Sequence, residues 1–130
     1  MKQKKIKVLM VEPGNHPTEV TLDNTLDSLQ KAVSIGTSYI GLIEIIPIDK
    51  KTLILCNEEG KLNGLEGNRK INGDIIAGTF YICGEDEQGN LTSLNESEIQ
   101  KYKTRFWNPE YYTEEEVEEA IYYTVKEWKL

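Results

Sequence analysis

Residues 39–56 have the sequence YIGLIEIIPIDKKTLILC, and this stretch decides the fold. Two apolar runs, residues 39–48 and 52–56, flank a short polar turn at residues 49–51. Apolar, β-branched runs on both sides of such a turn predict a β-hairpin. The first run is too apolar for a strand with one wet face, so we expect it in the centre of a sheet with both faces buried.

Further strands are predicted before and after this hairpin. Residues 4–11 and 18–22 are β-rich and surround a Pro-Gly-Asn turn at residues 13–15. Residues 75–83, IIAGTFYIC, are predicted to form the last strand, in which Gly78 indicates a bulge or a close backbone approach. The N-terminal lysines are interpreted as a charged sheet edge, with a binding arm as the alternative; they are Lys2, Lys4, Lys5 and Lys7.

A first helix is predicted over residues 24–35. Asn24 is a suitable N-cap, Asp27 is placed to complete a capping-box-like pair, and Gly36 is a natural stop after the helix. One face of this helix is apolar, as expected for a helix that packs on a sheet. The residues of that face are Leu26, Leu29 and Val33.

Two more helices are predicted in the C-terminal third. The first begins near residue 95 and the second near residue 113, each with a capping box. The pairs that indicate these starts are Asn95 with Glu98, Leu94 with Ile99 as a hydrophobic staple, and Thr113 with Glu116. The apolar stripe of the last helix is expected at Val117, Ile121, Thr124 or Val125, and Trp128, flanked by Tyr122 or Tyr123. Tyr111 and Tyr112 are expected to fill the end of the sheet or an oligomer interface.

Together these elements predict one α+β domain spanning residues 1–130. We expect a mostly antiparallel sheet of about five strands with helices packed on it, in the order β-β-α-β-β-β-α-α. No apolar run approaches the ~20 residues that span a bilayer. The basic N-terminus lacks the apolar length and the cleavage site of a signal peptide. We therefore expect a cytoplasmic protein that does not bind membranes.

The composition also restricts the function. A net charge of −7 and a pI near 4.8 argue against direct binding of nucleic acid through its phosphates. Cys56 and Cys83 lie in apolar runs without a CxxC partner, which predicts buried free thiols. His16 lies in a turn-rich stretch and is interpreted as a surface loop residue rather than a catalytic base. We therefore expect no zinc site, no cofactor and no enzymatic activity.

The candidate functional site is the loop predicted at residues 57–74, NEEGKLNGLEGNRKINGD, which has four glycines and no apolar periodicity. Such long loops in compact domains are usually functional or disordered. Amides bind polar groups, and an arginine binds phosphate or carboxylate in a forked geometry. A solvated loop in which Arg69 pairs with Asp74 or Glu59 is the alternative. The predicted ligand-binding residues are Asn57, Glu58, Glu59, Lys61, Asn68, Arg69, Asp74 and Thr79, with Asn72 in the same loop.

Several stretches resemble an uncharacterised bacterial family, catalogued as domain of unknown function thirty-eight forty-six. They are CNEEGKLNGLEGNRKINGDIIAGTFYICG at residues 56–84, LTSLNESEIQKYKTRF at 91–106, VLMVEPG at 8–14 and NTLDSLQKAV at 24–33. The resemblance covers about residues 6–106 and leaves residues 107–130 as a C-terminal helical extension. It implies a small accessory protein of a phage, plasmid or other mobile element, acting in a bacterial host cell, with no residue roles to transfer. It also implies a role in countering host defence, by association rather than by a physical argument.

Three functional hypotheses follow. The first is a non-enzymatic binder that sequesters a small polar ligand, such as a nucleotide-type immune signal, at residues 57–79. A homo-oligomer with the terminal helix as its interface would supply more positive charge to such a site. The second is an acidic protein-binding inhibitor, a DNA mimic directed at a basic host nuclease or restriction enzyme, because residues 110–130 hold seven Glu and two Lys. The alternative for that charge is a solvated helix face. The third is an accessory protein of the element without a defence role.

Overall fold

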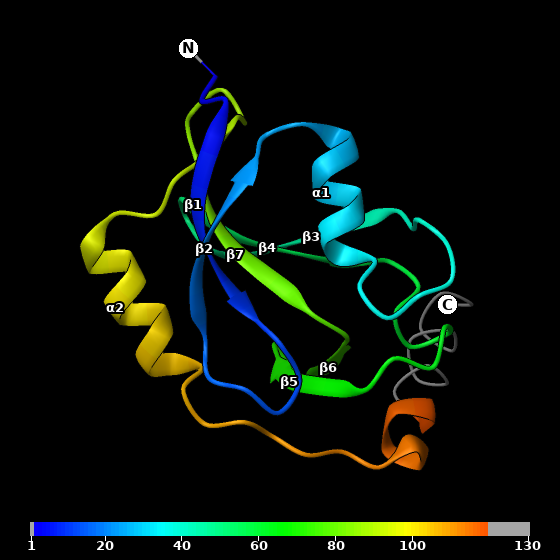
Figure 1. Ribbon diagram of the computed structural model, residues 1–130. Helices are drawn as coiled ribbons and strands as arrows, with labels where there is room; N and C mark the ends of the chain where they lie inside the picture. The colour runs from blue at the N-terminus through cyan, green and yellow to red at the C-terminus, as the bar shows by residue number, and fades with distance from the viewer. Residues whose placement is uncertain (1, 120–130) are drawn as a thin grey trace, which may run out of the picture.

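A computed structural model describes residues 2–119 of the chain. Within this range the elements follow one another as two strands, a helix, five strands, a two-residue strand and a helix (Figure 1). Residues 114–119 form a further helical turn. The bounds are β1 Lys5–Val11, β2 Thr18–Asp23, α1 Leu26–Val33, β3 Ile43–Asp49, β4 Thr52–Asn57, β5 Gly67–Ile71, β6 Asp74–Ala77, β7 Phe80–Glu85, β8 Leu91–Thr92 and α2 Glu96–Arg105.

The main sheet has the strand order β2-β1-β7-β4-β3, and β8 pairs with the end of β7. Every pairing is antiparallel. Strands β5 and β6 form a separate two-stranded hairpin. The α+β class and the mostly antiparallel sheet are confirmed, with six strands in the main sheet where about five were predicted. Among residues 2–119, no helix has the length and apolar character needed to cross a membrane.

The two helices cover opposite faces of the sheet. Successive residues of β4 show this, because side chains alternate between the two faces of a strand. Leu53 and Leu55 pack in a cluster with Leu29 and Val33 of α1. Ile54 packs in another cluster, whose members from α2 and its end are Ile99, Tyr102 and Phe106. In Figure 1 the sheet accordingly runs between α1 and α2. Buried apolar surface on both faces is the main stabilising contribution to this fold.

The predicted central position of residues 39–48 is wrong. The strand in this stretch, β3, lies at the edge of the sheet, and the fully buried strand of the hairpin is its partner β4. Ile40, Leu42 and Ile45 are each more than half exposed. Apolar content alone does not distinguish a buried central strand from an edge strand whose apolar side chains remain uncovered.

The predicted last strand, residues 75–83, is two strands in two different sheets. Strand β6 ends at Ala77, and β7 begins at Phe80. Gly78 lies between them with φ +87°, a left-handed conformation that glycine adopts without steric cost. A Cβ at this position would lie 2.6 Å from Cδ1 of Leu65. The predicted close approach is therefore present, but it breaks the strand rather than bulging it.

The N-cap predicted for the first helix is also wrong. Thr25 caps α1, and its hydroxyl oxygen accepts a hydrogen bond from the backbone N–H of Ser28. Asn24 is instead buried, and its Nδ2 donates to the backbone carbonyl of Gln3. Leu26 is 67% exposed, so it does not belong to the buried face that Leu29 and Val33 form.

The predicted starts of the two C-terminal helices are confirmed. Asn95 and Glu98 exchange both capping-box hydrogen bonds at the start of α2. Thr113 and Glu116 make the equivalent pair of bonds before residues 114–119. Val117 is buried as predicted. The other positions predicted for the last helix lie outside the described residues; they are Ile121, Tyr122, Tyr123, Thr124, Val125 and Trp128.

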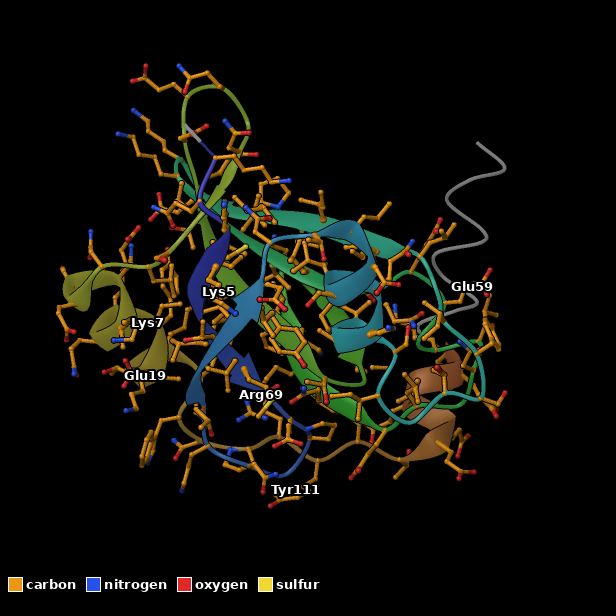
Figure 2. All side chains as sticks on the ribbon, turned by 45° about the horizontal axis from the view of Figure 1, so that its top comes forward. Lys5, Lys7, Glu19, Glu59, Arg69 and Tyr111 are labelled. Carbon is orange, nitrogen blue, oxygen red and sulfur yellow. The ribbon has the colours of Figure 1, made fainter. Side chains whose placement is uncertain are left out.

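The lysine-bearing first strand is not a sheet edge. β1 lies between β2 and β7, and its lysines form cross-strand ion pairs with β2. The Nζ atoms of Lys5 and Lys7 lie 2.6 and 3.5 Å from carboxylate oxygens of Asp23 and Glu19. Figure 2 shows Lys7 and Glu19 on the side of β1 and β2 that faces α2. The edge on this side of the sheet is therefore β2, and it is charged.

Candidate functional site

Residues 57–74 form an ordered turn and hairpin rather than an open loop. After β4, residues 58–64 make a series of turns, and β5 and β6 then pair across Asn72 and Gly73. These two residues have φ values of 51° and 81°. Positive φ at both central residues is typical of the two-residue turn that Asn-Gly favours. This dipeptide was the signal that the prediction of an aperiodic loop missed.

Arg69 of β5 is completely buried and acts as a structural residue. Its Nη2 donates to the backbone carbonyls of Asn15, at 2.7 Å, and Phe106, at 2.9 Å. Nε donates to the same Phe106 carbonyl, and Nη1 donates to Oδ1 of Asn68 at 2.7 Å. Burial lowers the pKa of Arg69, and the nearby Glu110 opposes this shift. The guanidinium is therefore directed at main-chain acceptors inside the protein.

Asn68 completes this arrangement. Its Nδ2 donates to the backbone carbonyls of Val11, at 2.8 Å, and Gly78, at 2.9 Å. We call Asn15, Asn68, Arg69 and Phe106 the Arg69 cluster. It joins the β5–β6 hairpin to the end of β1, to the loop before β2 and to the end of α2. Buried polar groups that are fully hydrogen-bonded in this way fix the relative placement of the elements they join.

The proposed pairing of Arg69 with Asp74 or Glu59 is not what the structure shows. Asp74 forms an ion pair with Lys61, and Oε2 of Glu59 accepts a hydrogen bond from the Tyr39 hydroxyl. Among residues 2–119, no carboxylate makes an ion pair with Arg69. Figure 2 shows Glu59 pointing outward at one end of the molecule, away from Arg69.

The eight predicted ligand-binding residues therefore fall into two groups. Four are buried and bonded within the protein or packed in it: Asn57, Asn68, Arg69 and Thr79. Asn57, for example, donates through Nδ2 to the Val33 carbonyl and accepts through Oδ1 from the Glu59 N–H. The other four lie toward the surface: Glu58, Glu59, Lys61 and Asp74. The structure does not bring the two groups together into one site.

A pocket of about 320 Å³ lies beside the second group. It is bounded by residues 61–67 and by the start of the terminal helix. Its apolar wall consists of Leu65, Tyr112 and Val117, which pack on the small cluster formed by Ile75 and Ala77. Its polar groups are Lys61, Glu66, Glu114 and Glu118. The volume is at the lower end of the range typical of small-molecule sites.

Gly67 allows the pocket wall to form. A Cβ at this position would lie 3.0 Å from atoms of both Tyr112 and Val117, so only glycine lets these side chains approach β5 so closely. The hydroxyl of Tyr112 donates to Oε1 of Glu110. Burial, together with this hydrogen bond to a carboxylate, raises the pKa of Tyr112 to about 12. Tyr112 is therefore a neutral, fixed wall of the pocket at physiological pH.

Cys56, Cys83 and His16 are held by burial or by contacts within the protein. Both thiols are buried, and desolvation raises the pKa of Cys56, and that of Cys83 to about 12. A reactive cysteine requires the opposite shift. His16 stacks on Trp107 with ring centroids 4.0 Å apart, and its Nδ1 donates to the Trp107 carbonyl. Within residues 2–119, no three His, Cys, Asp or Glu side chains are grouped so that they could hold a metal ion.

Two groups of acidic residues in the C-terminal third differ in their surroundings. Asp86 and Glu98 have local structural roles, since Asp86 accepts from the N–H groups of Gln88 and Asn90, and Glu98 closes the capping box of α2. The glutamates of the terminal helical turn are exposed; they are Glu114, Glu115, Glu116, Glu118 and Glu119. Exposed carboxylates near a helix N-terminus interact favourably with the helix dipole, which accounts for part of this charge without a partner.

The fold and the pocket together define a small α+β domain with a recessed, mixed polar and apolar surface site. The family described as a domain of unknown function (DUF3846) matches residues 6–107, and the chain belongs to this family. No curated protein and no solved structure matches the chain. The matched range includes the Arg69 cluster and residues 61–67 of the pocket, whereas Tyr112, Val117 and the exposed glutamates lie beyond it.

Sequence reasoning missed the residues that complete this region. Leu65 and Tyr112 were not predicted as site residues, because they become neighbours only after the hairpin folds back on the terminal helix. A usable signal existed in Gly67 and Gly78, because glycine marks close approaches of other chain segments, and a Cβ at these positions would meet Tyr112 and Leu65 respectively.

Proposed function

We propose that this protein is a non-enzymatic binding protein that sequesters a small ligand in the pocket between residues 61–67 and residues 112–118. The observation that carries the proposal is the pocket itself, with an apolar wall on one side and charged groups at its rim. Ligand sites in proteins typically combine apolar walls with a few polar groups that orient the ligand.

The charges of the pocket restrict the ligand. One lysine and three glutamates line it, so its net charge is −2. The lysine is in addition already paired with Asp74. A polyphosphate would be repelled here, whereas a neutral or cationic ligand with a flat apolar part would suit Leu65 and Tyr112. Within the nucleotide-type ligands expected from the sequence, the pocket favours a nucleoside-like group over a chain of phosphates.

The biological role that we propose for this binding is counter-defence on behalf of a phage or another mobile element in a bacterial cell. This part rests on the family resemblance. Sequestration needs no catalytic group, and it requires only a site that holds the ligand and removes it from its receptor.

Two measurements test the ligand proposal. Native mass spectrometry of protein purified gently from cells with an active nucleotide-based defence should show an additional, stoichiometric mass. Isothermal titration with adenosine, spermidine and ATP should then rank the neutral and cationic probes above ATP. ATP as the tightest of the three would contradict the charge argument. A bare protein that binds none of these probes would contradict the proposal itself.

A matched pair of variants locates the site. Glu66→Lys reverses an exposed charge at the pocket rim, and Glu87→Lys makes the same change in the turn after β7, away from the pocket. Loss of a charge-assisted hydrogen bond weakens binding of a cationic ligand by about tenfold or more. Glu66→Lys should show this loss and Glu87→Lys should not. Equal affinity of the two variants would place the ligand elsewhere.

The second candidate function is an acidic inhibitor that imitates DNA. The specific observation in its favour is the row of exposed glutamates at residues 114–119. Charge reversal at Glu115 and Glu119, which do not line the pocket, should abolish counter-defence activity if mimicry is the mechanism. Binding to a basic host nuclease should in that case weaken steeply with added salt. An unchanged activity would exclude this candidate while leaving the pocket proposal intact.

A further inference from the structure

The outer side of β3 carries backbone groups that no strand of residues 2–119 covers. β3 is the last strand of the sheet order, and it pairs only with β4. The Leu42 carbonyl accepts from the Glu58 N–H, so the backbone groups of Leu42 point toward the β4 side. Because these directions alternate along a strand, the groups of Ile43 and Ile45 point outward. The backbone groups of Pro47 point outward as well. Proline has no N–H, but because that group would point away from β4, no hydrogen bond between β3 and β4 is lost.

The same edge is mostly apolar, and the charged side chains of β3 itself are the exposed Glu44 and Asp49. Residues 32–43 contain no charged side chain in a chain with 28% charged residues. Along it the exposed fractions are 55% for Ile40, 62% for Leu42 and 55% for Ile45. We call residues 39–47 the β3 edge. Uncovered apolar edges of this kind are templates for pairing with another strand.

The two ends of the β3 edge carry opposite charge. Lys50 and Lys51 are exposed at the turn after β3, and Glu58 and Glu59 are exposed beside its beginning. When two identical edges pair in the antiparallel direction, the lysine end of each copy meets the glutamate end of the other. Parallel pairing would bring like charges together. The edge is therefore electrostatically complementary to itself in the antiparallel direction.

The opposite edge of the sheet, β2, lacks exposed large apolar side chains. Strand β2 contains Glu19 and Asp23, and both carboxylates are paired with lysines of β1. Acidic residues are present on both edge strands, but β2 has no large apolar side chain that is mostly exposed, in contrast to Ile45 of β3. Of the two edges formed by the described residues, only the β3 edge therefore exposes apolar surface that a second strand could cover.

We propose that two copies of this chain associate through their β3 edges, antiparallel and about a twofold axis near Ile45, to form one continuous sheet. In this arrangement the backbone groups of Ile45 bond to those of the second Ile45, and Ile43 donates to Pro47 of the other copy. A twofold interface uses the same patch on both copies, as this edge requires. The inference is independent of the ligand proposal, since no residue of the β3 edge lines the pocket.

The first test is the mass in solution. Light scattering coupled to size exclusion should give twice the 14.9 kDa chain mass at micromolar concentration and above. Ile45→Lys should weaken self-association on the order of tenfold or more, because it places a charge at the centre of the contact. Leu26→Lys makes the same change at a residue of similar exposure in α1, and it should leave the dimer intact.

The second test uses the charges at the ends of the edge. The variant Lys50→Glu/Lys51→Glu has negative charge at both ends, and Glu58→Lys/Glu59→Lys has positive charge at both ends. Each protein alone should dimerise more weakly than the wild type. An equimolar mixture should form a heterodimer, because both ends of the mixed pair are then attractive. Added salt should reduce the difference between the mixture and the separate variants.

Three results would overturn the proposal. A wild-type protein that stays monomeric at every concentration would exclude the dimer and leave the edge for a foreign apolar strand. A dimer that survives Ile45→Lys, in a variant whose thermal melting matches the wild type, would place the interface elsewhere. Failure of the two charge variants to form a mixed dimer would exclude antiparallel pairing. None of these results bears on the pocket, so the two proposals fail separately.

Discussion

The two faces of the main sheet are closed to different degrees. The face under α2 is closed by a helix with a full capping box and by the Arg69 cluster, whose buried guanidinium makes four hydrogen bonds. The face under α1 is covered by a shorter helix, and Ile45, which lies opposite Leu55 on that face, is 55% exposed. One side of the molecule thus has its hydrogen bonds and apolar contacts satisfied internally. On the other side, apolar side chains of β3 remain exposed, and the outer backbone groups of this edge strand have no partner strand among the described residues.

Because of this difference, we expect substitutions on the two sides to affect different properties of the protein. Substitutions on the closed side should change the free energy of unfolding, because they remove buried hydrogen bonds or fill close contacts. Substitutions on the open side should change mainly what the protein binds. The following variants test that separation, from the largest expected effect to the smallest.

Arg69→Met should cause the largest loss of stability. It leaves the carbonyls of Asn15 and Phe106 and the amide oxygen of Asn68 without their donor, at about 1–3 kcal/mol for each buried acceptor. We expect a loss of about 3 kcal/mol or more in the free energy of unfolding, measured by urea denaturation. Lys70→Met, at the exposed neighbouring position, should stay within about 0.5 kcal/mol of the wild type. Equal stability of the two variants would contradict a structural role for the Arg69 cluster.

Gly78→Ala should come next. Gly78 and Gly89 both have positive φ, at 87° and 83°, so alanine strains the backbone at either position by about 1–2 kcal/mol. Only at Gly78 does the new Cβ meet another group, the Leu65 side chain at 2.6 Å, whereas nothing lies within 4 Å of a Cβ at Gly89. Gly78→Ala should therefore cost about 1–3 kcal/mol more than Gly89→Ala. Thermal denaturation of both variants would measure this packing contribution alone.

The helix caps compare the two faces directly. Asn95→Ala removes half of the capping box of α2 and should cost about 1 kcal/mol. Thr25→Ala removes one cap hydrogen bond of 3.2 Å from α1, without a reciprocal partner, and should cost less. Urea denaturation of the two variants gives the order. A larger effect at Thr25 would mean that α1 is held more tightly than its exposed surroundings indicate.

The smallest effect is a dependence of stability on pH at Asp49. Its carboxylate accepts from Lys101 and Tyr102, and the hydrogen bond and charge of Lys101 are the main cause of a pKa lowered from 3.8 to about 2. A lowered folded-state pKa stabilises the protein above pH 4, and the contribution is lost as the pH falls from about 4 to about 2. Asp49→Asn should remove this part of the acid dependence. Because the pair is exposed, added salt should reduce its effect.

Local patterns were the predictable part on both sides of the sheet. The capping box of Asn95 and Glu98, the staple of Leu94 and Ile99, and the hairpin of β3 and β4 are local patterns, and all are present. The exposure of β3 was not predictable, because it depends on whether β7 pairs with β3 or with β4. In the structure β7 pairs with β4, which leaves β3 at the edge of the sheet. The register of β4 with β7 is a long-range property that apolar content does not encode.

The site shows the same limit. Glu58, Glu59, Lys61 and Asp74 lie toward the surface, and they were selected for their charge. Arg69 has the same kind of side chain as a ligand-binding residue, but its acceptors come from residues 15, 68 and 106, which are distant in sequence or lie inside the core. Only the folded chain shows that these acceptors meet at Arg69. Its neighbour in the sequence, Lys70, remains exposed.

The strand order has a consequence for how the chain folds during synthesis. β1 with β2 and β3 with β4 are hairpins of adjacent segments, and β7 is the strand that lies between them. Isolated two-stranded hairpins are marginally stable in water. Until residues 80–85 have left the ribosome, the two hairpins lack the shared strand that joins their apolar surfaces. We therefore expect nascent chains of which fewer than about 85 residues have emerged to depend on chaperones, and the sheet to form cooperatively once β7 pairs between β1 and β4.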